Sequence, residues 1–103
     1  MDAILKIGDG ERKLFEADEH WIIDQINQRK RDSLHICIQV LIDFGGRKMR
    51  LTTPTCEGTG GGGLEPTAQE KQIFDLWDKM GMNTYDFNAG KLIAFRSHLK
   101  KIL

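Results

Sequence analysis

The chain has 103 residues, and its fifteen Lys and Arg residues balance fifteen Asp and Glu residues. This length is typical of one domain, the neutral charge argues against a protein that coats nucleic acid by bulk charge, and no apolar run approaches the ~20 residues of a membrane-spanning helix. The two cysteines are too few for a disulfide scaffold, and the N-terminus lacks the basic start and apolar core of a secretion signal. We therefore expect a single domain over residues 1–103, located in the cytoplasm with free thiols and without a membrane partner.

The first predicted element is a β-hairpin over residues 3–15. Its turn contains Gly8–Gly10, and this Gly-Asp-Gly sequence is typical of tight turns. A two-residue loop would place Lys6 opposite Lys13, whereas a three-residue loop would place Lys6 opposite Arg12. Both registers oppose like charges, so we expect this hairpin to face water or to be locally irregular.

A helix of about four turns is predicted next, over residues 18–31. Asp18 can serve as its N-cap, and the three cations at residues 29–31 oppose the negative end of the helix dipole. Its apolar stripe, which should face the core, contains Trp21, Ile22 and Ile26.

A second β-hairpin is the strongest local prediction. Apolar and polar residues alternate over residues 34–44, and Gly45-Gly46 then allows the positive φ values of a two-residue turn. This turn sets a register in which one face stays mostly apolar and the other gains the charge-compatible pair Asp43–Lys48. The register places Phe44 opposite Arg47, Asp43 opposite Lys48, Ile42 opposite Met49, Leu41 opposite Arg50, and Val40 opposite Leu51.

A glycine-rich loop is predicted over residues 54–66, with five of the eleven glycines lying between Gly58 and Gly63. Its backbone amides precede a helix start and could bind an anion. No Lys or Arg lies between Thr52 and Glu70 to assist such binding, so the composition favours a flexible tether.

Two helices complete the chain. Thr67 and Glu70 have the spacing of a capping box, and Gly81 follows the apolar stripe as a natural stop. The last helix begins near Asn88 and has a regular amphipathic face. The element order ββαββαα therefore predicts an α+β fold with a mainly antiparallel four-stranded sheet packed on helices.

The candidate functional residues favour binding over catalysis. No carboxylate pair, metal-ligand cluster or nucleophile–base pair shows a specific spacing, so we expect no enzymatic activity, no cofactor and no metal. We predict a small protein-interaction or adaptor domain that binds a protein partner or a second copy of itself. Its predicted surface combines Leu41 and Arg50 of the polar strand face with two aromatic residues expected to be exposed before the last helix, Tyr85 and Phe87.

Two alternative functions are predicted from other residues. In the first, the last helix binds nucleic acid through phosphate contacts made by Lys91, Arg96, Lys100 and Lys101. Residues 70–77 and 96–103 resemble the two ends of a helix-turn-helix DNA-binding domain of response-regulator type, which implies the same function, although residues 82–90 lack its middle helix. In the second, Cys56 is the nucleophile of a thiol-dependent enzyme.

Overall fold

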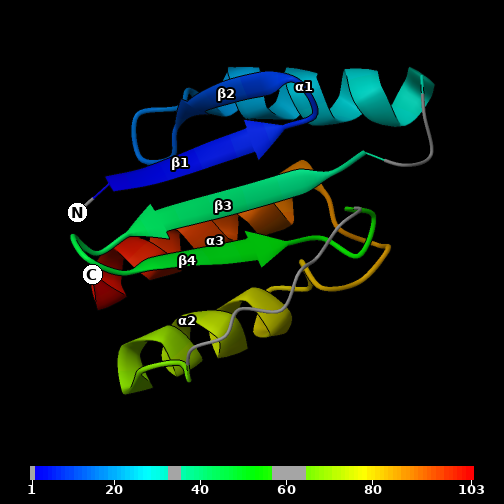
Figure 1. Ribbon diagram of the computed structural model, residues 1–103. Helices are drawn as coiled ribbons and strands as arrows, with labels where there is room; N and C mark the ends of the chain where they lie inside the picture. Colours follow the sequence, from blue (N-terminus) through cyan, green and yellow to red (C-terminus); the bar gives the residue numbers. More distant parts are fainter. Residues whose placement is uncertain (1, 33–35, 57–64) are drawn as a thin grey trace.

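The computed structural model describes residues 2–32, 36–56 and 65–103, and its elements follow the predicted order ββαββαα (Figure 1). The predicted α+β class is confirmed. Residues 57–64, which hold the glycines of the predicted tether, lie outside the described ranges. The elements are β1 (Asp2–Ile7), β2 (Gly10–Lys13), α1 (Glu19–Asp32), β3 (Ile38–Asp43), β4 (Lys48–Thr52), α2 (Ala68–Lys79) and α3 (Ala89–Ile102).

The four strands form one antiparallel sheet in the order β2-β1-β3-β4. The predicted register of the β3–β4 hairpin is confirmed at each of its strand pairs, and the Phe44 amide donates to the Arg47 carbonyl at 2.7 Å. Strand β3 begins at Ile38, later than the predicted start at residue 34. Because β1 pairs with β3, the two hairpins meet at the centre of the sheet.

The register of the β1–β2 hairpin differs from both predicted registers. Lys6 lies opposite Glu11, and their side chains form an ion pair at 3.6 Å. Both predictions are wrong because the two-residue turn consists of Gly8 and Asp9, one residue earlier than the Asp9-Gly10 turn that would place Lys6 opposite Lys13. Gly8 has a φ of 57°, whereas Gly10 is already the first residue of β2. Opposite charges therefore face each other on this hairpin.

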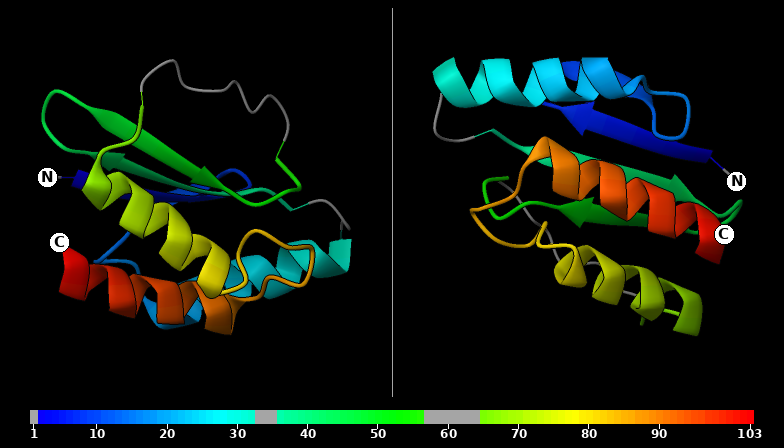
Figure 2. Two further views of the ribbon diagram at one scale, coloured as in Figure 1. Left: turned by 90° about the horizontal axis from the view of Figure 1, so that it is seen from below. Right: turned by 180° about the vertical axis from the view of Figure 1, so that it is seen from behind.

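All three helices cover the same face of the sheet, and α3 lies between α1 and α2 in that layer (Figure 2). The capping box of α2 is confirmed, since Thr67 Oγ1 accepts the Glu70 amide and Glu70 Oε1 accepts the Thr67 amide. Gly81 follows the end of α2 with a φ of 79°, a conformation that glycine adopts without strain.

An apolar core fills the space between the sheet and the helices. Trp77 and Phe95 pack edge to face with ring centroids 5.0 Å apart, which joins α2 to α3. Trp77 Nε1 also donates to the Thr52 carbonyl at 3.0 Å and thereby joins α2 to the edge of the sheet. The fully buried core residues include Leu5, Ile7, Leu14, Ile22, Ile26, Ile38, Val40, Ile73, Met82, Leu92, Phe95 and Leu99.

Candidate functional site

The sheet face opposite the helices is the best candidate for a binding surface. Side chains alternate along each strand, so Leu5 of β1 is fully buried while its neighbours Ile4 and Lys6 are partly exposed on the other face. Among the described residues, no helix or strand packs over this second face (Figure 2). We call it the open face, and it contains Asp2, Ile4, Lys6, Glu11, Lys13, Gln39, Leu41, Asp43, Lys48, Arg50 and Thr52.

A row of four residues crosses the middle of the open face, one from each strand. Ile4 lies opposite Leu41 on β3 and opposite Lys13 on β2, and Leu41 lies opposite Arg50 on β4. We call Lys13–Ile4–Leu41–Arg50 the central row. Its two apolar side chains are half-buried and its two cations are exposed. Adjacent strands lie about 4.8 Å apart, so the backbone positions of Lys13 and Arg50 are about 14 Å apart.

The cations of the central row, Lys13 and Arg50, form no ion pair within the part of the chain that the structure describes. Two anions of the open face are instead already engaged. Glu11 faces Lys6 at 3.6 Å, and Asp43 Oδ1 accepts the Gly45 amide at 2.8 Å. The central row therefore presents an apolar pair between two available positive charges.

The predicted surface residues fall into two separate groups. Leu41 and Arg50 are brought together as predicted, whereas Tyr85 lies in the turn between α2 and α3, within the layer on the other side of the sheet. Tyr85 is 73% exposed, but Phe87 is only 1% exposed, so the prediction of an exposed Phe87 is wrong. Phe87 directly precedes the N-cap Asn88, and with the buried Leu92 it has the spacing of a hydrophobic staple, a signal that the sequence contains.

A lysine of α1 also covers Phe87. Lys30 Nζ lies 4.6 Å from the centroid of the Phe87 ring and donates to the Phe87 carbonyl. This contact fixes the entry of α3 against α1, so Phe87 is a structural residue and not an anchor for a partner.

The cations of α3 do not form one free basic surface. Arg96 has a side chain that is 14% exposed, and it donates to the carbonyls of Leu14 and Ala17. Lys91 Nζ donates to the Asp86 carbonyl at 3.2 Å. Both residues therefore tie α3 to neighbouring segments, while Lys100 and Lys101 remain exposed.

A shallow hollow lies beside these cations. It has a volume of about 220 Å³ and is lined by Phe15, Glu19, Ile93, Arg96, Ser97 and Lys100. Three of its lining residues are charged: Arg96 and Glu19 lie 3.9 Å apart, and Lys100 is a further, exposed cation. Because Arg96 and Glu19 already face each other and Arg96 also donates to two carbonyls, only the charge of Lys100 is left without an ion pair among the described residues of this hollow.

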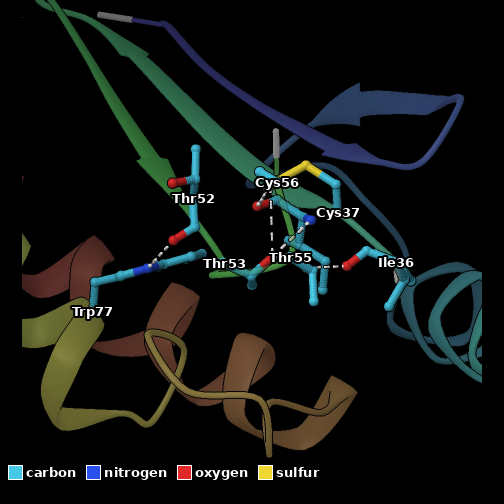
Figure 3. Close-up of a disulfide and its surroundings, with 8 residues drawn as sticks. Ile36, Cys37, Thr52, Thr53, Thr55, Cys56 and Trp77 are labelled. Atoms are coloured by element: carbon cyan, nitrogen blue, oxygen red, sulfur yellow. Dashed lines mark hydrogen bonds between the residues drawn. A yellow bond between two sulfur atoms is a disulfide. The ribbon is translucent and has the colours of Figure 1, made fainter. Parts of the chain in front are cut away.

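The two cysteines form a disulfide (Figure 3). The expectation of free thiols is therefore wrong, and in this bonded state Cys56 has no thiolate with which to attack a substrate. The bond forms because Cys37 directly precedes β3 and Cys56 shortly follows β4, which brings their Cα atoms to 4.7 Å. The sequence does not indicate this pairing, because Cys56 lies in the stretch 54–66 that is predicted to be a flexible loop.

A chain of hydroxyl groups continues the β3–β4 contact beside the disulfide (Figure 3). The Ile38 amide donates to Thr53 Oγ1 at 3.1 Å, Thr53 and Thr55 share a hydrogen bond of 2.8 Å, and Thr55 Oγ1 donates to the Ile36 carbonyl. Thr53 is buried, and these bonds satisfy its hydroxyl. Residues 53–56 are therefore held firmly against the start of β3.

An ion pair joins the β3–β4 turn to the start of α2. Arg47 Nε donates to Glu70 Oε2 at 2.7 Å, and the Glu70 side chain is only 5% exposed. The hydrogen bond from Arg47 and the bond from the Thr67 amide hold the pKa of Glu70 below its ordinary value, while Glu70 raises the pKa of Arg47. Both charges are therefore used to hold the fold together.

Comparisons with known proteins give no functional information, so a proposal must be based on the fold and the open face. No family model, curated protein or solved structure matches the chain. Residues 80–86 form turns and a bend, and α3 begins only at Ala89, so the middle helix of a helix-turn-helix domain is not found between α2 and α3. Within the described residues, no group of three or more His, Cys, Asp or Glu side chains could hold a metal ion, and none of the helices is long and apolar enough to cross a membrane.

Proposed function

We propose that this domain is a protein-interaction module without catalytic activity, and that it binds its partner through the open face. The central row carries the proposal, because it places two half-buried apolar side chains between two cations that have no ion-pair partner among the described residues. Apolar residues that gather on an otherwise charged surface are typical of a binding site. A partner that covers Ile4 and Leu41 would remove the remaining apolar area from water.

Affinity capture with a matched pair of variants tests this proposal. The wild-type protein, Leu41→Asp and Tyr85→Ser are immobilised and exposed to an extract of the cells that produce the protein. We expect the same partner to be retained by the wild type and by Tyr85→Ser, and to be lost from Leu41→Asp. Melting curves must first show that both variants are folded. Equal retention by Leu41→Asp, or a strictly monomeric protein that retains nothing, would contradict the proposal.

We also propose a cytoplasmic location, which requires that the Cys37–Cys56 disulfide is reduced inside the cell, so the cysteine pair provides the test. Disulfides persist mainly in oxidising compartments, whereas a reducing cytoplasm keeps thiols free. Thiols are alkylated in intact cells before lysis, and the modified protein is weighed by mass spectrometry. Alkylation of both Cys37 and Cys56 would support a cytoplasmic location, and an unmodified pair would contradict it.

A further inference from the structure

We infer that the partner presents an acidic–apolar–acidic segment to the central row, an inference that rests on the proposed function of the open face. The segment places one apolar side chain on Ile4 and Leu41 and one carboxylate near each of the flanking cations, Lys13 and Arg50. The cross-strand register that aligns these four residues carries the inference.

The spacing of the central row fits an extended chain that crosses the strands. The backbone positions of the two cations are separated by three strand spacings, about 14 Å, and an extended chain advances about 3.4 Å per residue. Residues i and i+4 of such a chain are therefore about 13.6 Å apart and point to the same side. The pattern acid-x-apolar-x-acid brings its central side chain over Ile4 and Leu41 when its two acids lie over Lys13 and Arg50.

The charges of the open face favour anions at these two positions. Lys13 and Arg50 have no ion-pair partner among the described residues, whereas Lys6 already faces Glu11. An acidic segment would therefore gain two new ion pairs without breaking one that the fold contains. Complementary charges of this kind select a partner and orient it.

A second copy of this chain fits the central row poorly. When two copies stack with their central rows aligned, the two-fold axis lies either along the strands or across them. In the first arrangement, Lys13 meets Arg50 of the other copy, and in the second, each cation meets its own equivalent. Both arrangements place like charges together, so self-association is disfavoured on this face.

A single-stranded nucleic acid also fits this face poorly. Proteins that bind single strands stack the bases on aromatic side chains and line the backbone path with cations. The open face as described contains no aromatic residue, and it includes the anions Asp2, Glu11 and Asp43. An acidic protein segment therefore matches the open face better than a polyphosphate chain does.

The test is a titration of the ¹⁵N-labelled full chain with short capped peptides, followed by amide chemical shifts. The probe contains Glu-Thr-Leu-Thr-Glu, and its controls are Lys-Thr-Leu-Thr-Lys and Glu-Thr-Ser-Thr-Glu. We expect the probe to shift the amides of Ile4, Lys13, Leu41 and Arg50. Each control peptide should bind at least roughly tenfold more weakly than the probe. Doubling the salt concentration should weaken binding of the probe.

A charge exchange distinguishes specific pairing from general attraction. The double variant Lys13→Glu/Arg50→Glu should prefer the lysine peptide, whereas Lys71→Glu, an exposed cation on α2, should keep the preference of the wild type. Equal binding of both charged peptides, an unchanged preference in the double variant, or no shifts on the open face at millimolar probe would overturn the inference. Stronger shifts on the same face with a single-stranded thymidine oligonucleotide would overturn it in favour of nucleic acid. The proposed function fails separately, because the capture experiment contradicts it either when Leu41→Asp retains as much partner as the wild type or when a strictly monomeric wild type retains nothing.

Discussion

Removing the Cys37–Cys56 disulfide should lower the free energy of unfolding by about 3 kcal/mol. The bond joins residues with a sequence separation of 19, so it closes a loop of about 20 residues in the unfolded chain. In the chain-entropy treatment, a loop of this length reduces the entropy of the unfolded chain by about 11 cal/mol/K, or about 3.3 kcal/mol near room temperature. A domain of this size has a total stability of about 5–15 kcal/mol, so the loss is large enough to measure.

Urea unfolding followed by the fluorescence of Trp21 and Trp77 measures this loss. The wild type is compared with and without a phosphine reductant, and with the double variant Cys37→Ala/Cys56→Ala. For a slope of about 1–3 kcal/mol/M, the urea midpoint should fall by about 1–3 M on reduction. The double variant should unfold like the reduced wild type and should not respond to the reductant.

Two results would refute this reasoning. The first is an unreduced protein that, once unfolded in urea, reacts with a thiol reagent at both cysteines, since the disulfide would then be absent. The second is an unchanged urea midpoint after a thiol assay has shown that reduction is complete. Such a result would contradict the chain-entropy treatment, in which breaking the bond increases the conformational entropy of the unfolded chain.

Three further predictions concern residues inside the fold. Because the pKa of Glu70 is lowered, its contribution to stability is present above its unfolded pKa and is lost as the pH falls through the lower folded pKa. Between about pH 7 and pH 3, urea titrations should therefore show a larger loss of stability for the wild type than for Glu70→Gln, and equal losses would contradict the pairing. Phe87→Ala should cost about 3–5 kcal/mol in the same assay because it empties a buried site, whereas Tyr85→Ala should change stability by less than about 0.5 kcal/mol; similar costs would contradict their assigned burial. Arg96→Ala should cost about 1–3 kcal/mol by leaving two carbonyls without their donor, and Lys101→Ala, the control on the same helix, should be nearly neutral.

The sequence predicts the local parts of this fold well. The β3–β4 hairpin is predictable because strict alternation and a Gly-Gly turn fix both its face and its register, and a slip of one residue would reverse every side chain. The capping box of Thr67 and Glu70 is predictable for a similar reason, since both partners lie within one helical turn. On the open face, the same local pattern predicts that Leu41 and Arg50 lie side by side, because they are cross-strand neighbours within one hairpin.

The other half of the central row depends on contacts between distant segments. Ile4 and Lys13 join the row only because β1 pairs with β3, and the element order alone does not determine which strands become neighbours. The burial of Phe87 and the bonding of Cys56 are likewise decided by segments far away in the chain, α1 and the start of β3. Sequence patterns indicate on which face of a strand or helix a residue lies, but tertiary packing determines which other segments cover that face.

The position of α3 in the middle of the helix layer has a consequence for synthesis on the ribosome. The strands and the two flanking helices all leave the ribosome before α3 does, because α3 follows them in the chain. Until residues 89–102 emerge, the core positions filled by Leu92, Phe95 and Leu99 are empty and the middle of the sheet lies bare. Any sheet that forms before α3 has emerged therefore exposes these apolar side chains to other molecules.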